Sequence, residues 1–308
     1  MEQFYSNGKL LVSGEYLVLD GAVSLALPTK YGQSLEVQST NSNQLIWKSF
    51  NVLNECWFQA TFDLETFLIL NHTSIDLNSE KIAKTLQEIL RTAKILNPDF
   101  LRNSNGLQVV TQLSFPNKWG LGTSSTLINN VAQWAKINAF ELLEKSFGGS
   151  GYDIACAQNK FPITYKRNGI APMVEKVRFN PVFKDQLFFV YLNHKQDSKE
   201  GIQMYRSLSV DKKELITKVD KITQKLLTTQ NIEDFELLLN EHEKLIGELL
   251  QLIPVKEKLF SDYTGAIKSL GAWGGDFVLV TGQKLYVESY FTNKGFDTIV
   301  LYTDMILT

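Results

Sequence analysis

The sequence predicts an α+β fold of two domains, and three observations support this. The chain has 308 residues, which is about twice the usual size of one domain. Its first forty residues contain several short apolar segments typical of strands, whereas the second half mixes strand-like segments with long charged helical ones. Helices and strands mixed in this order indicate an α+β architecture.

The N-terminal half is predicted to open with strands and to continue with helices. The strands expected first are residues 9–13, 16–19, 23–27 and 34–38, with a turn at Asp20-Gly21. Asn78 precedes a run with helical periodicity that ends before Pro98. A further strand at 107–113 leads through a glycine-containing stretch into a predicted helix at 127–135. A strand, a tight loop and a helix start therefore follow one another.

The texture of the sequence changes between Pro172 and Pro181, and we place a domain boundary there. The two expected domains are residues 1–175 and 176–308. In the second domain we expect strands at 187–192, 277–281 and 298–302, and helices from about 198, across 211–251 with a break near Asn231, at 256–268 and at 284–290.

Composition and charge exclude several classes of protein. Thirty-one Lys and Arg residues oppose 33 Asp and Glu residues, so no global positive field attracts nucleic acid or a membrane surface. The longest strongly apolar run, Leu187–Leu192, is far shorter than the roughly 20 residues of a membrane span, and no secretion signal opens the chain. We therefore expect a cytoplasmic protein. Two cysteines and three histidines show no spacing typical of a disulfide framework or metal site.

The segment Gly120-Leu121-Gly122-Thr123-Ser124-Ser125-Thr126 has the chemistry of a phosphate-binding loop. Glycines allow backbone N–H groups to converge on a ligand, the following helix presents its positive end, and hydroxyl groups can bind phosphate oxygens or Mg²⁺. The segment lacks the Gly-Lys-Ser/Thr ending of a Walker loop. A capped turn without a ligand is the alternative.

Two further glycine-rich segments carry a carboxylate. Asp153 follows the turn 148–151, where it could accept a hydroxyl proton; its alternative role is to cap a helix that starts at Ile154. Asp276 ends the segment 271–276 (GAWGGD), which precedes a predicted strand. Glycines there permit close backbone approach to a ligand, and an ordinary turn is the alternative.

Together these segments resemble the GHMP kinase superfamily, which includes galactokinases, homoserine kinases, mevalonate kinases and phosphomevalonate kinases. GKLLVSGEYLVLDG (8–21) resembles the family's opening motif, GLGTSST its phosphate loop and GAWGGDF its C-terminal glycine motif. Within the group, GEYLVLDG, GSGYDIACA and the Asp of GGD look most like phosphomevalonate kinases. The GYDIA string resembles the signature of a bacterial subgroup.

The resemblance implies a fold with a ribosomal protein S5 domain 2-like N-terminal domain and a ferredoxin-like C-terminal domain. It implies ATP and Mg²⁺ as cofactors, a small-molecule acceptor, and a monomer or homodimer. Lys9 would steady the acceptor oxygen and Asp153 would be catalytic. The residues implied around the triphosphate are Gly120, Leu121, Gly122, Thr123, Ser124 and Ser125, with Ser125 as the hydroxyl on Mg²⁺. The residues implied at the substrate are Gly14, Glu15, Ser150, Gly151, Gly274, Gly275 and Asp276.

The sequence also departs from the family pattern. Ser125 and Asp153 are 28 positions apart (153 − 125), about half the spacing in many members by resemblance, so the helix that carries a Mg²⁺-binding glutamate is shortened. Glu141 is the predicted replacement, with Glu144 on the same helix face; solvated surface charges are the alternative. We expect a mevalonate-pathway kinase, with a phosphomevalonate-like acceptor ahead of mevalonate. The alternative is a catalytically impaired member that binds a nucleotide or metabolite.

Overall fold

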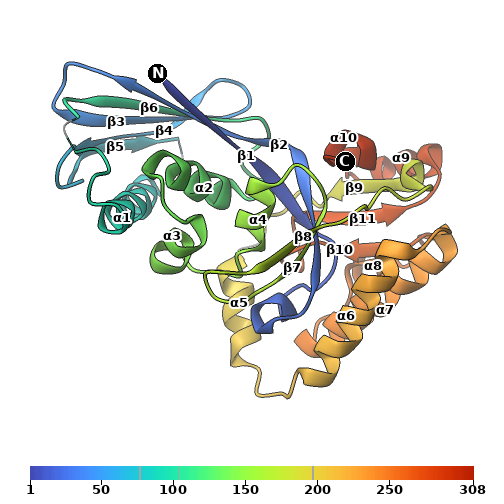
Figure 1. Ribbon diagram of the computed structural model, residues 1–308. Coiled ribbons are helices and arrows are strands. Elements are labelled where there is room, and N and C mark those ends of the chain that lie inside the picture. Colours follow the sequence, from blue (N-terminus) through green and yellow to red (C-terminus); the bar gives the residue numbers. More distant parts are fainter. Residues whose placement is uncertain (76–77, 103, 196–197) are drawn as a thin grey trace. The chain divides into compact units, whose positions relative to one another are not determined.

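A computed structural model describes residues 1–75, 78–102, 104–195 and 198–308 (Figure 1). Strands of the described residues form two sheets, and the α+β expectation is confirmed. The chain folds into two compact units. Unit 1 comprises residues 1–8, 31–117 and 122–158, and unit 2 comprises residues 9–30, 118–121 and 159–308. Both units combine segments that are distant in sequence, and a single division at 175/176 stays a prediction.

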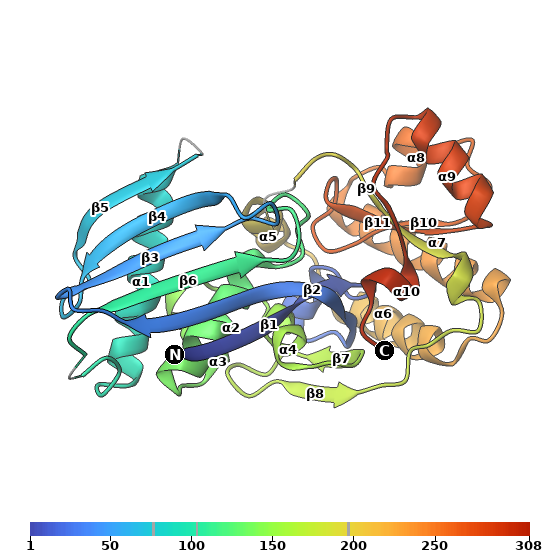
Figure 2. The same ribbon diagram turned by 90° about the horizontal axis from the view of Figure 1, so that it is seen from above.

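Unit 1 contains a twisted sheet built mainly from antiparallel pairs (Figure 2). The chain enters it through β1 (Glu2–Leu11) and β2 (Ser24–Ser39); the end of β1, from Lys9, and the start of β2, up to Lys30, belong to unit 2. From β2 the order continues through β6 (Leu107–Leu113), β3 (Gln44–Phe50), β4 (Cys56–Asp63) and β5 (Ile69–Ser74). The β3–β6 pair is parallel, and the β2–β6, β3–β4 and β4–β5 pairs are antiparallel.

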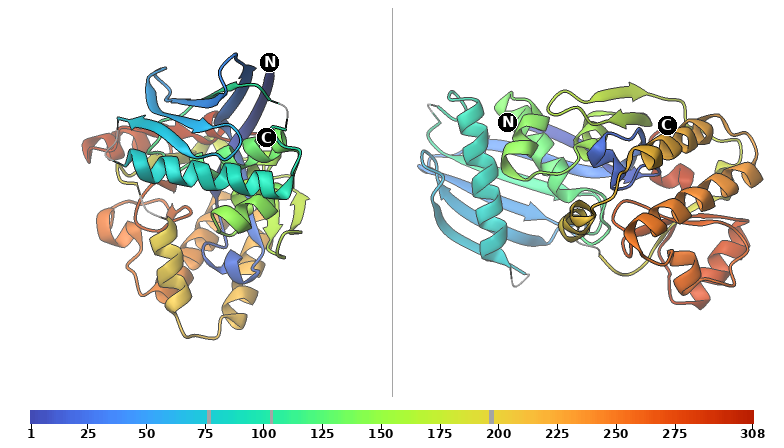
Figure 3. Two further views of the ribbon diagram at one scale, coloured as in Figure 1. Left: turned by 90° about the vertical axis from the view of Figure 1, so that its left-hand side faces the viewer. Right: turned by 90° about the horizontal axis from the view of Figure 1, so that it is seen from below.

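Helices cover one face of this sheet, as the view from below shows (Figure 3). They are α1 (Ser79–Leu96), α2 (Thr123–Ala135), α3 (Ala139–Ser146) and α4 (Tyr152–Gln158). Alternate strand residues such as Leu45, Trp47 and Phe58 point toward the helices and are buried with them in one apolar core. The helix predicted after Asn78 and ended before Pro98 is confirmed as α1.

Unit 2 contains the smaller sheet, in the order β10 (Ile267–Ser269), β11 (Phe277–Thr281), β9 (Leu187–Tyr191) and β12 (Ile299–Leu301). Every residue of β9 and β11 is buried, in agreement with their continuous apolar sequences. Helices α7 (Ile232–Leu250) and α8 (Val255–Leu259) contact β10, and α10 (Tyr302–Met305) contacts β9 and β12. The remaining elements of unit 2 are η1 (Leu17–Asp20), β7 (Ile163–Lys166), β8 (Met173–Lys176), η2 (Lys184–Gln186), α5 (Ser198–Ser207), α6 (Lys213–Thr228) and α9 (Lys284–Asn293).

Three local predictions differ from the structure. Residues 16–19 were expected as a strand, but Leu17–Asp20 form a 3₁₀ turn because Gly14 and Tyr16 adopt positive φ angles of 86° and 61°. The helix expected at 256–268 ends at Leu259, and the chain then enters β10. Strands β3, β4 and β5 were not predicted. Within the described residues, no helix is long and apolar enough to cross a membrane.

Candidate functional site

The predicted phosphate loop lies at the N-terminus of α2. Gly120 and Gly122 both have positive φ angles, 66° and 93°, which glycine adopts without strain. Gly122 is the N-cap residue, and no side chain caps this helix end. The N–H groups of the first turn are therefore available to an anion, and the dipole of this 13-residue helix favours negative charge at the same place.

Ser125 and Asp153 are brought together in unit 1. The Ser125 hydroxyl donates a hydrogen bond of 3.0 Å to Asp153 Oδ2, and Ser125 is only 6% exposed. Asp153 Oδ1 is buried and has no hydrogen-bond partner among the described residues. Asp153 lies within the first turn of α4, which begins at Tyr152, so it does not cap a helix that starts at Ile154. A buried carboxylate oxygen without a partner can accept a proton or contact a cation.

A buried polar network sets the position of α2 and α4. Asn129 accepts a hydrogen bond of 3.0 Å from the Gln158 side chain and donates one of 2.8 Å to the Ser6 hydroxyl. Ser6 donates in turn to Asn130 Oδ1, and Asn130 donates to the Gln33 carbonyl oxygen. These residues were not predicted from the sequence. The signal for them was the Asn129-Asn130 pair inside an otherwise apolar helix, because buried amides require partners.

Lys9 holds the first part of the loop in unit 2. Its backbone N–H donates to the Leu121 carbonyl oxygen at 3.0 Å, and its ammonium donates to the Gly120 carbonyl oxygen at 2.9 Å. The opening strand β1 therefore continues its hydrogen bonding into residues 120–121. This places a compact positive charge beside the predicted phosphate loop.

Asp276 approaches the same glycine from the third motif. A Cβ atom added to Gly120 would lie 2.3 Å from Asp276 Cγ, so only glycine fits at this position. Asp276 is 8% exposed and has a positive φ of 55°, and its N–H donates to the His194 carbonyl oxygen at 2.6 Å. Gly274 and Gly275 belong to the same loop. Within unit 2, residues from all three predicted motifs therefore lie together: Lys9, Gly120 and Asp276.

The other predicted substrate residues have structural partners. Glu15 is fully buried and forms an ion pair with Lys268, and a Cβ atom on Gly14 would lie 2.1 Å from Ser24 Oγ. Both residues are therefore enclosed by protein atoms. Gly151 is buried with a φ of 89°, and its carbonyl oxygen accepts the N–H of Ala155 at the start of α4. A substrate contact for Ser150, which is half-buried, stays a prediction.

Ser125 and Asp153 suit Mg²⁺ better than Glu141 does. A hydroxyl and a carboxylate oxygen without a partner are ligands that Mg²⁺ accepts, together with waters and the phosphates of a nucleotide. Glu141 on α3 instead forms an ion pair of 2.8 Å with Lys145. Over the described ranges, no group of three or more His, Cys, Asp or Glu residues could hold a metal ion. The structure thus gives no support for Glu141 as a ligand.

Comparisons with known proteins identify the fold. The chain is similar to the Methanococcus jannaschii mevalonate kinase structure (TM-score 0.71, 16% identity, covering 100% of this chain and 98% of that one). It is also similar to Streptococcus pneumoniae phosphomevalonate kinase in complex with phosphomevalonate and AMPPNP (TM-score 0.67, 15% identity, covering 100% of this chain and 98% of that one). A third similar structure is Lactococcus lactis galactokinase complexed with galactose (TM-score 0.65, 12% identity, covering 100% of this chain and 95% of that one). No protein-family model matches the sequence, and no curated protein matches it. The chain has the GHMP kinase fold over its whole length.

Proposed function

We propose that this protein is an ATP-dependent phosphotransferase that transfers the γ-phosphoryl group to a small-molecule hydroxyl. The observation that carries the proposal is the Ser125–Asp153 pair beside the uncapped N-terminus of α2, with Asp153 Oδ1 buried and without a partner in the described residues. Phosphoryl transfer requires mainly positioning and neutralisation of charge, so these groups are chemically sufficient.

The roles of the side chains follow from their contacts. The N–H groups at the start of α2 would bind phosphate oxygens, and the Lys9 ammonium beside Gly120 would offset negative charge at the loop. The two Asp153 oxygens have different roles. Oδ2 already accepts a hydrogen bond from the Ser125 hydroxyl, so Oδ1 is the atom that would accept the proton of the substrate hydroxyl. Mg²⁺, held by Ser125 Oγ and the phosphates, would neutralise charge that develops during transfer.

We further propose a mevalonate-pathway acceptor, with a phosphomevalonate-like molecule ahead of mevalonate. This rests on the resemblance of GEYLVLDG, GSGYDIACA and GGD to phosphomevalonate kinases. It is consistent with a fold shared with mevalonate and phosphomevalonate kinases, although galactokinase shares the fold as well. The acceptor is therefore the part of the proposal that needs a direct screen.

A catalytically impaired nucleotide-binding protein is the second candidate. It is favoured by the absence of a three-ligand metal cluster in the described residues and by the ion pair that occupies Glu141. Such a protein would bind Mg-ATP at α2 without transferring phosphate. The two candidates differ in turnover and agree in nucleotide binding.

The experiment is an ADP-release assay with Mg-ATP and a panel of mevalonate, 5-phosphomevalonate, homoserine, galactose and no acceptor, combined with ATP calorimetry. We expect release that depends on one acceptor, and a loss of about 100-fold or more in Asp153→Asn with nearly unchanged ATP affinity. The matched control is Asp99→Asn, which removes an exposed carboxylate paired with Arg102 in the same unit. ATP binding without release for any acceptor would favour the second candidate, and no ATP binding would refute both.

A further inference from the structure

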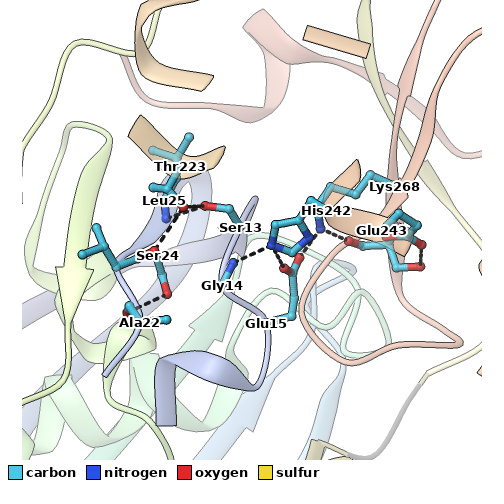
Figure 4. A network of polar contacts seen from close by, with 12 residues as sticks. Ser13, Gly14, Glu15, Ala22, Ser24, Leu25, Thr223, His242, Glu243 and Lys268 are labelled. Carbon is cyan, nitrogen blue, oxygen red and sulfur yellow. Dashed lines mark hydrogen bonds and ion pairs between the residues drawn. The ribbon is translucent and has the colours of Figure 1, made fainter. Parts of the chain in front are cut away.

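A buried ionic pair joins the first motif to the small sheet of unit 2. Lys268 Nζ lies 2.5 Å from Glu15 Oε1, and both side chains have no exposed surface. The same ammonium donates to the Ser269 carbonyl oxygen at 2.8 Å. Figure 4 shows the pair beside His242, whose Nε2 accepts the Gly14 N–H at 2.9 Å. The sequence alone does not connect these residues, because Glu15 and Lys268 are 253 positions apart.

This cluster is poorly suited to stabilising the fold. Removing two charges from water offsets most of their attraction, and apolar residues of similar volume often serve stability as well or better. Two further atoms, Glu15 Oε2 and His242 Nδ1, are buried and have no hydrogen-bond partner in the part of the chain that the structure describes. A role in positioning explains the pair better than a role in stability.

Glu15 and its neighbour hold the near end of the third motif. Burial raises the pKa of the Glu15 carboxyl group, and the backbone of Gly271, which lies close to this group, partly offsets the rise. The adjacent Tyr16 hydroxyl accepts the Trp273 N–H at 3.3 Å. The first motif is therefore bonded directly to the loop 271–276 through Tyr16 and Trp273, and Glu15 is the residue next to that bond.

The loop 271–276 depends on such external contacts. Gly271, Gly274 and Asp276 have positive φ angles of 69°, 97° and 55°, and glycine-rich backbone of this kind has many alternative conformations. Its far end is fixed, because Asp276 exchanges backbone hydrogen bonds with Leu192 and His194 after β9. Its near end is held by the bond between Trp273 and Tyr16, and the adjacent Glu15 is held in place by Lys268.

We infer that Lys268, acting through Glu15, is a positioning residue that fixes the loop 271–276 and so holds Asp276 against Gly120 of the phosphate loop. Lys268 is buried in β10, and none of its described contacts is with the loop glycines or with Asp276. The catalytic consequence rests on the proposed function. The effect on the loop does not, because it is measurable without nucleotide or acceptor.

The test compares Lys268→Met, Glu15→Met and the double variant by hydrogen exchange, thermal melting and ADP release. Either single change leaves a buried charge without its partner, so both should melt at lower temperature, whereas the double variant should recover most of that loss. Exchange at 271–276 should rise about tenfold in all three variants, and ADP release should fall about tenfold even in the double variant. The control is Lys294→Met, which removes an exposed ion pair with Asp262 in the same unit.

The outcomes separate positioning from stability. A double variant whose melting temperature and loop exchange both return to wild type would overturn the inference, because the pair would then serve stability alone. If the single variants do not fold, the double variant still gives the decisive exchange measurement. If the wild-type protein shows no ADP release, the exchange result stands by itself, and only the proposed function fails.

Discussion

Replacing Gly120 by alanine tests the contact between the second and third motifs. The Gly120 φ of 66° is in the left-handed region, which costs alanine about 1–2 kcal/mol. The new Cβ would lie 2.3 Å from Asp276 Cγ and Oδ2, and Asp276 is 8% exposed, so its carboxylate has little space to move. Overpacking of this kind adds about 1–3 kcal/mol. We therefore expect Gly120→Ala to lower the free energy of unfolding by about 2–5 kcal/mol.

Gly148→Ala separates the two contributions. Gly148 has a similar φ of 75°, but an added Cβ atom there has no heavy atom within 4 Å. This variant should lose only the backbone contribution of about 1–2 kcal/mol. Urea unfolding of both variants, and of Gly120→Ala combined with Asp276→Gly, forms the assay. The second change removes the obstructing carboxylate and should cancel the excess cost.

Equal destabilisation by Gly120→Ala and Gly148→Ala would refute the close approach of Asp276 to Gly120. A full excess that persists after Asp276→Gly would contradict it as well, because the clash would then involve other atoms. Neither result would affect the conclusion that the loop backbone at Gly120 is in the left-handed region. They would remove the claim that the second and third motifs are in contact.

Two further predictions concern pH and helix capping. Burial raises the pKa of Glu243 to about 7 from an ordinary value of 4.5. Between these two pH values the folded state binds a proton at Glu243 that the unfolded state has already released. The free energy of unfolding therefore falls as pH rises from about 4.5 to 7. Glu243→Gln retains an acceptor for the Ser269 N–H and hydroxyl but has no carboxyl group to ionise. Its free energy of unfolding, measured by urea unfolding at each pH, should therefore rise relative to wild type by up to about 3 kcal/mol between pH 5 and 8. A difference that stays constant with pH would contradict this. Asn138 accepts the Phe140 N–H at 2.8 Å as the N-cap of α3, so Asn138→Ala should cost about 1 kcal/mol in the same assay, and an unchanged midpoint would exclude a capping role.

The elements that the sequence predicted well carry strong local signals. Helix α1 follows Asn78, shows apolar residues at helical spacing and ends before Pro98, and the structure places it at Ser79–Leu96. Strand β6 coincides with the predicted residues 107–113 because its apolar residues alternate. In both segments, propensity, periodicity and boundaries agree, so tertiary contacts have nothing to override.

Other elements lacked such a signal or were overridden. The run at residues 16–19 is apolar without alternation, and the turn conformation imposed by Gly14 and Gly21 decides its structure. Strand β3 was not predicted, although Leu45 and Trp47 alternate with half-buried residues and this period of two is typical of a strand.

Residue chemistry predicted the components of the site, and tertiary structure supplied their pairing. A hydroxyl-rich loop and an acidic residue after a glycine turn were evident in the sequence, but the bond between Ser125 and Asp153 depends on the packing of α4 against α2. The pairing of Glu15 with Lys268 could not be predicted from the sequence either, because it also depends on tertiary packing. Glu15 was predicted at the substrate; its side chain is fully buried and paired with Lys268, and a substrate contact stays a prediction.

The most direct test of the central claim is ³¹P NMR of the protein with Mg-ATP and the acceptor found by the ADP-release screen. We expect the γ-phosphate resonance of ATP to decline while a phosphorylated-acceptor resonance grows, and we expect Asp153→Asn to bind ATP but to give no such product on the same time scale. Formation of inorganic phosphate alone, or transfer by Asp153→Asn at the wild-type rate, would contradict the assignment of Ser125 and Asp153 as the centre of a phosphotransferase.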